Sequence, residues 1–171
     1  MPAFRKMPKA EPKALTPGRT RAAVALMVTL IGTLVFIWGN SLASRDQSLQ
    51  QSGWVAGLIR PLVCWLPVCS LHTEEGLMHF TRKLAHFAEY FLLGGQLAGL
   101  ALVLRPLRAF SFFALLLIAL LVATVDELLQ FISARAPMVA DIVLDGMGAS
   151  AGIALVLGID FIIRRRKYGV A

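Results

Sequence analysis

The sequence has few charged residues for its length and a correspondingly high proportion of apolar residues. Only 16% of its 171 residues are charged, whereas 57% are apolar and the mean hydropathy is +0.71. This balance excludes an ordinary soluble domain, in which about a quarter of the residues are charged. The length is sufficient for one small helical membrane domain and leaves little for a second.

Cysteine is scarce as well, and the two cysteines, Cys64 and Cys69, do not form a recognisable motif. Their C-x4-C spacing differs from the C-x-x-C of redox and zinc sites. A disulfide is allowed if they lie in an extracytoplasmic loop. Two free thiols are favoured, because residues five apart on a helix point away from each other. H-E-x-x-H and nucleophile-elbow motifs are also missing, so the sequence names no metal and no cofactor.

Acidic residues are outnumbered: 10 acidic residues stand against 17 basic ones, which gives a net charge of +7. Such a balance can indicate nucleic-acid binding. Here the basic residues lie beside long apolar runs, where anionic lipid headgroups and membrane topology account for them better. We therefore expect membrane lipids as partners and no nucleic acid.

Long apolar runs are abundant and predict the fold. Four of them, at 22–38, 84–104, 109–125 and 142–163, approach the length needed to cross a bilayer core of about 30 Å. Between the first two, Gly53–Ser70 is apolar but broken by prolines, which favours an interfacial or re-entrant helix. The predicted fold is all-α, a polytopic membrane bundle of about four transmembrane helices.

The basic residues also predict the domain boundaries and the orientation. Residues 1–21 form an expected disordered basic arm, 22–163 the transmembrane domain and 164–171 a basic tail. Twelve of the 17 basic residues lie in the arm, the tail and the turn at 105–108. The positive-inside rule then places both termini in the cytoplasm, which requires an even number of spans. Eight of the ten acidic residues fall on the opposite side, so we expect any site to face outward.

Polar residues interrupt the apolar runs at these outer ends. Lys83, His86 and Tyr90 share one face of an expected helix, with Glu89 beside it. Ionisable groups at the end of a membrane helix are costly and usually contact a partner, so counter-charges are expected from other spans. The candidate catalytic residues are Lys83, His86, Glu89, Asp126 and Glu127, and the candidate substrate-binding residues are Asn40, Ser41, Tyr90, Gln130, Arg135, Asp141 and Asp145.

Glycines in the last span predict how these groups come together. Asp145 is followed by Gly148 and Gly152, a small-xxx-small pattern that lets two helices approach closely. The last helix is therefore expected to pack tightly against a neighbour. Asp145 lies on the same side, so its carboxylate is predicted to point into the bundle.

Several motifs occur together and in a distinctive order. They are F-x-R-K-x-x-H-F-x-E-Y at Phe80–Tyr90, D-E-x-x-Q at Asp126–Gln130, D-x-x-x-D-G-x-G at Asp141–Gly148, and the pair Asn40-Ser41. Over roughly Phe36–Gly152 the chain resembles the VanZ-like family, with a departure at Ala134–Met138 that keeps Arg135. The resemblance implies a multi-pass protein of the bacterial cytoplasmic membrane and a link to resistance to the glycopeptide teicoplanin. It implies no particular chemistry.

Three functions remain open on these residues. The first is an enzyme acting outside the membrane on a lipid-linked or cell-envelope substrate, with His86 and carboxylates as acid and base and with Arg135 and Lys83 holding a phosphate or carboxylate. The ligand types of His86, Glu89, Asp126 and Glu127 would also suit a divalent cation. The second is a non-catalytic binder of the same component. The third is an ion-coupled transporter, which ranks last because the charges lie at one end of the bundle.

Each polar residue also has a structural interpretation. Arg82 is interpreted as an interfacial anchor whose charged end reaches the membrane surface. Glu127 and Asp141 are interpreted as partners of Lys83 and Arg135 in ion pairs that fix the bundle. His79 lies at the entrance of its helix and is interpreted as incidental.

Overall fold

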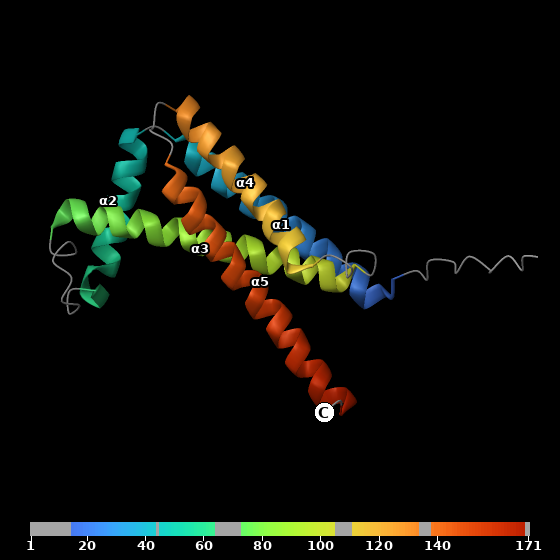
Figure 1. The fold of residues 1–171 in the computed structure, drawn as a ribbon. Helices are drawn as coiled ribbons and strands as arrows, with labels where there is room; N and C mark the ends of the chain where they lie inside the picture. The colour runs from blue at the N-terminus through green and yellow to red at the C-terminus, as the bar shows by residue number, and fades with distance from the viewer. Residues whose placement is uncertain (1–14, 44, 64–72, 105–110, 134–137, 170–171) are drawn as a thin grey trace, which may run out of the picture.

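The computed structural model describes residues 15–43, 45–63, 73–104, 111–133 and 138–169. Within these residues the chain forms five α-helices and no strand (Figure 1). They are α1 (Pro17–Leu42), α2 (Arg45–Val63), α3 (Glu74–Val103), α4 (Phe112–Ile132) and α5 (Val139–Tyr168). The predicted all-α class is confirmed.

Local sequence signals mark where these helices begin and end. Pro17 starts α1, at a position where its missing N–H leaves no hydrogen bond unmade. Thr73 caps α3 by accepting a hydrogen bond from the backbone N–H of Gly76, and Ser111 caps α4 in the same way. At the other end of the chain, α5 ends at Gly169, whose left-handed φ of 59° suits glycine.

Three of the five helices, α1, α4 and α5, are long and apolar enough to cross a membrane. This is fewer than the four spans predicted from the sequence, and the remaining predicted span, 84–104, lies in α3, which is less apolar. With 30 residues, α3 measures about 45 Å and is long enough to cross. Polar side chains such as Glu89 and Gln96 lower its hydropathy, which is why its composition sets it apart from the other three.

Several helices are longer than predicted. α1 includes the last five residues of the predicted arm, while residues 1–14 lie outside the described chain. α4 continues beyond the apolar run that ends at Val125, through Asp126 and Glu127 to Ile132, as the helical spacing of Asp126 and Gln130 predicted. α5 continues through the basic residues 164–167, whose charge is favourable at a helix C-terminus. The start of the predicted interfacial piece, Gly53–Ser70, is helical in α2, whereas Cys64 and Cys69 lie outside the described residues.

α3 runs through the middle of the bundle, and α5 crosses it at close range (Figure 1). A Cβ on Gly148 would collide with the carbonyl oxygen of Phe87, and one on Gly152 with the carbonyl oxygen of Phe91. From α3, Gly94 faces the backbone of Ala149 equally closely. The tight approach predicted from the glycines of the last span is confirmed.

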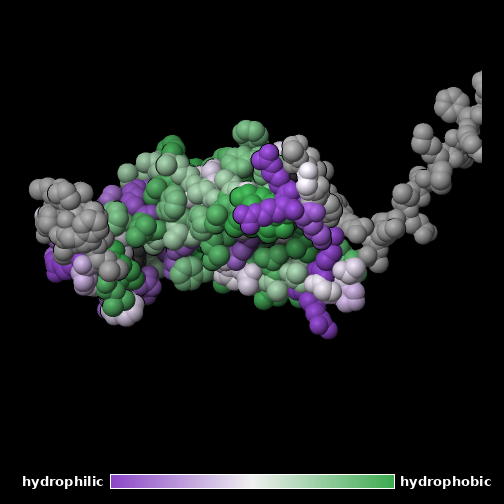
Figure 2. All heavy atoms as spheres, turned by 90° about the horizontal axis from the view of Figure 1, so that it is seen from below, coloured by the Kyte–Doolittle hydropathy of each residue, from purple (hydrophilic) through white to green (hydrophobic). Residues whose placement is uncertain are grey.

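The core joins α1, α3, α4 and α5. Its fully buried members include Ile37, Tyr90, Ala123 and Ala149, one from each of these helices. The outside of the bundle is apolar, and in Figure 2 the hydrophilic residues gather mainly toward the two ends of the visible face. This distribution fits a helical bundle surrounded by lipid.

The α3–α5 crossing leads to a test of stability. Gly152→Ala should lower the free energy of unfolding by about 1–3 kcal/mol, because the added methyl group has no space beside the backbone of Phe91. The matched control is Gly158→Ala on the same helix, where nothing lies within 4 Å. Thermal unfolding in mild detergent, followed by circular dichroism, measures both variants. Equal midpoints for the two variants would contradict the observed packing.

Candidate functional site

The buried polar side chains gather where the C-terminal ends of α1 and α4 meet the N-terminal halves of α3 and α5. This concentration was predicted from the sequence, which placed its candidate residues at the same ends of the expected spans. Seven of those candidates are buried: Ser41, Tyr90, Asp126, Glu127, Gln130, Asp141 and Asp145. Buried polar groups need partners, so their hydrogen bonds show what each one does.

Gln130 organises the carboxylates of α4. Its Nε2 donates to Asp126 Oδ2 at 3.2 Å and to Glu127 Oε1 at 2.9 Å. The other oxygens of these two carboxylates accept from Ser41 Oγ, 2.5 Å from Asp126 Oδ1, and from the backbone N–H of Met138, 2.9 Å from Glu127 Oε2. The helical spacing of this motif predicted the shared face. The network ties α4 to the end of α1 and to the start of α5.

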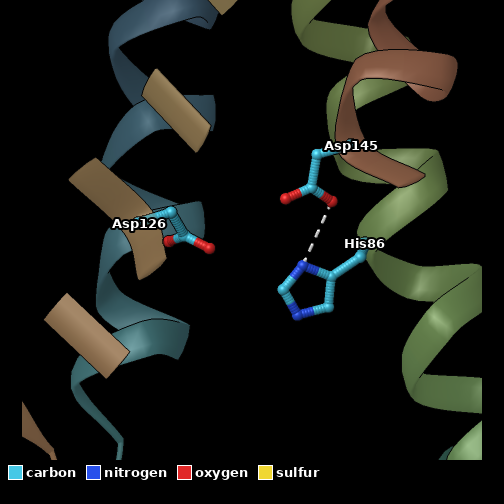
Figure 3. A group of neighbouring side chains, drawn as sticks. All are labelled: His86, Asp126 and Asp145. Atoms are coloured by element: carbon cyan, nitrogen blue, oxygen red, sulfur yellow. Dashed lines mark ion pairs between the residues drawn. The ribbon is translucent and has the colours of Figure 1, made fainter. Parts of the chain in front are cut away.

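His86 faces Asp145 from the neighbouring helix. The His86 Nδ1 lies 3.4 Å from Asp145 Oδ1, and Asp126 approaches the same space from α4 (Figure 3). Asp145 is fully buried, and within the described residues neither of its oxygens has a hydrogen-bond partner. The carboxylate points into the bundle, as the glycine pattern predicted.

Two further contacts connect α3 to its neighbours. Asn40 Nδ2 donates to Glu89 Oε1 at 3.2 Å, and Arg82 Nη2 donates to Gln130 Oε1 at 3.1 Å. Tyr90 is fully buried in the core, and its hydroxyl has no hydrogen-bond partner among the described residues. Arg82 therefore reaches the α4 network instead of serving only as a surface anchor.

Lys83 forms an ion pair with Asp141 of α5. The sequence placed both residues in a set of ion pairs without fixing which residues pair, and the observed pair lies largely inside the bundle, with the two side chains 27% and 8% exposed. Glu127 bonds to Gln130 and Met138, as described above. Arg135 lies outside the described residues.

A pocket of about 530 Å³ opens between α1, α2 and α3. Four of the candidate residues line it: Asn40, Ser41, His86 and Glu89. Asp126, Glu127, Gln130 and Asp145 lie outside its lining, and through His86 and Ser41 the pocket contacts the buried carboxylates behind them. Such a volume is in the usual range of small-molecule sites.

Arg82 and Trp54 are among the lining residues that the sequence did not assign to a site. Arg82 was interpreted as an anchor, although its spacing of four and seven residues from His86 and Glu89 puts all three on one helical face. For Trp54 of α2 the sequence contains no signal for its place on the pocket wall. That place depends on how α2 packs against α3 through Ala56 and Leu77.

Comparison with known protein families identifies the class of helical membrane protein to which this chain belongs. The VanZ/LLP1 family model matches residues 24–163, and the chain belongs to this family. The resemblance seen in the sequence is thereby confirmed. Comparison with the curated proteins and with the solved structures gave no match.

The Lys83–Asp141 pair leads to a test in the form of a double-mutant cycle. Lys83→Met or Asp141→Asn alone should destabilise the protein, because each leaves its partner without a counter-charge in a largely buried position. The double variant should recover part of the loss, with a coupling energy of about 0.5–3 kcal/mol. Thermal unfolding of the four proteins measures this coupling.

The exposed pair Arg60–Glu74 supplies the control for this cycle. Its side chains are 47% and 67% exposed, so its coupling energy should be below about 1 kcal/mol. Equal couplings for the two pairs would show that the Lys83–Asp141 contact does not stabilise the bundle.

Proposed function

We propose that this VanZ-family membrane protein binds the phosphate-bearing headgroup of a lipid or lipid-linked cell-envelope component in the pocket between α1, α2 and α3. The observation that carries the proposal is the mixed lining of the pocket. Phe36, Trp54 and Val55 form its apolar side, and the other side is defined by polar and charged residues such as Asn40, Arg82 and Glu89. An amphiphilic ligand matches such a lining better than a wholly polar metabolite does.

The polar side would hold the headgroup. Arg82 is the cationic side chain of the described lining, and a guanidinium presents several donors to a phosphate. His86 and Asn40 add hydrogen-bonding groups on the same side. Lys83 was expected to bind the substrate's anionic group as well, but its ion pair with Asp141 favours a structural role.

The apolar side would hold the start of the ligand's hydrocarbon chain. Phe36, Trp54 and Val55 line it, and all three are exposed on the outside of the bundle. Leu58, one helical turn after Trp54 on α2, is 60% exposed and extends the same apolar surface. A chain lying along this surface would remain in contact with the membrane.

The proposed orientation of the protein in the membrane combines the distribution of the basic residues with the number of spans. In this proposal α3 also crosses the membrane, which makes four spans, and its polar side chains contact α1, α4 and α5. Both termini are then cytoplasmic, and the pocket opens at the outer face of the membrane. The resemblance implies a link to teicoplanin resistance. In this proposal the link depends on which cell-envelope component the pocket binds.

A second candidate is an enzyme that acts on the same ligand. The observation that favours it is the contact between His86, which lines the pocket, and the buried Asp145. An imidazole oriented by a carboxylate is a common acid–base pair. Conversion of the bound ligand by the wild type, and its loss in His86→Gln with binding retained, would distinguish the enzyme from the binder.

Retention of phosphatidylglycerol by the full chain tests the binding proposal. Native mass spectrometry in mild detergent should show one molecule bound to the wild type and at least tenfold weaker retention in Arg82→Ala, because the cationic contact to the phosphate is lost. The control is Arg60→Ala, which removes an arginine of α2 paired with Glu74 and absent from the pocket lining. Equal retention by the two variants would contradict the proposal.

A further inference from the structure

Three helices bring potential metal ligands to one place. His86 comes from α3, Asp126 from α4 and Asp145 from α5, and one ligand atom from each lies within 4.8 Å of the others. Both aspartates are fully buried, and the imidazole is partly buried. In Figure 3 the three side chains point toward a common space.

Asp145 has oxygens that no described residue satisfies. Its side chain is completely buried, and neither oxygen has a hydrogen-bond partner in the described part of the chain. The 3.4 Å separation from His86 Nδ1 is longer than the usual hydrogen bond of about 2.7–3.2 Å. A buried carboxylate whose close contact is one ring nitrogen at 3.4 Å is poorly stabilised, so the position of Asp145 suits a bound cation.

The charged side chains around the cluster also favour a bound cation. Asp126 and Asp145 bring two carboxylates to the His86 ring, and the cationic side chains of Lys83 and Arg82 on α3 have partners elsewhere. Lys83 pairs with Asp141, and Arg82 donates to Gln130. A divalent cation between the two carboxylates would cancel their charge in a region where it is poorly solvated.

We propose that His86, Asp126 and Asp145 together bind one divalent transition-metal ion of the Zn²⁺ or Mn²⁺ class. One imidazole nitrogen and two carboxylates suit these ions, and three protein ligands leave a coordination position open. Bonds of about 2.1 Å allow ligand atoms to lie up to about 4.2 Å apart across the ion, so a small rotation of the side chains completes the site.

The surroundings of Asp126 also fit a metal ligand. Ser41 and Gln130 each donate to one of its oxygens and fix its orientation, as outer partners of metal-binding carboxylates do. The proposal does not depend on what occupies the pocket. Because His86 also lines the pocket, the ion would lie beside the bound ligand.

Titration with Co²⁺ tests the site, because this ion gives a visible absorption band that depends on its ligands. The full chain in mild detergent, stripped with a chelator, should bind one Co²⁺ that Zn²⁺ displaces. Asp145→Asn should weaken binding at least tenfold, since it removes a ligand. Asp160→Asn supplies the matched control on α5, where Asp160 pairs with Arg164 away from the cluster.

The result can overturn the proposal in two ways. A folded wild type that binds no Co²⁺ up to millimolar concentration contradicts it, whatever the variants do. Equal affinities for wild type and Asp145→Asn contradict it as well. If circular dichroism shows that Asp145→Asn does not fold, His86→Gln replaces it, and wild-type affinity in that variant counts against the proposal.

Discussion

The contact on which the rest of the structure depends is the crossing of α3 and α5. Gly148 and Gly152 remove the side chains that would hold the two backbones apart. The resulting approach places Asp145 beside His86, with the carboxylate fully buried and the imidazole partly buried. The composition of α3 differs from that of the three apolar helices, and its Thr81, Tyr90 and Gln96 are buried in the bundle. Such polar groups are stable in lipid only when neighbouring helices cover them.

Around this crossing, most of the buried carboxylates have distinct partners. Asp126 and Glu127 accept hydrogen bonds that tie α4 to α1 and α5, and Asp141 pairs with Lys83 of α3. These contacts connect all four helices of the bundle at one end, which explains why so many polar residues are tolerated there. Asp145 differs from them, because its one close contact among the described residues is the His86 ring. The structural network and the candidate site therefore share residues but have different roles.

Sequence periodicity was sufficient to predict the residues that meet along a single helix. The spacing of Asp126 and Gln130 predicted their shared face, and the position of Asp145 relative to the glycines predicted its burial. The wall that α2 gives to the pocket could not be predicted, because Trp54 reaches it through tertiary packing instead of a local motif. Hydropathy was also insufficient for α3, because the predicted span 84–104 contains Gln96, whose burial by neighbouring helices the sequence does not show.

The central proposal is that α3 crosses the membrane in addition to α1, α4 and α5, which brings the number of spans to four. The two ends of the chain test it most directly, because they lie on the same side with four spans and on opposite sides with three. In a cysteine-free background, Gly18→Cys and Arg166→Cys would each be treated with a membrane-impermeant maleimide in intact and permeabilised cells. We expect both positions to react only after permeabilisation of the membrane. Labelling of Arg166→Cys in intact cells, with Gly18→Cys protected, would contradict the account.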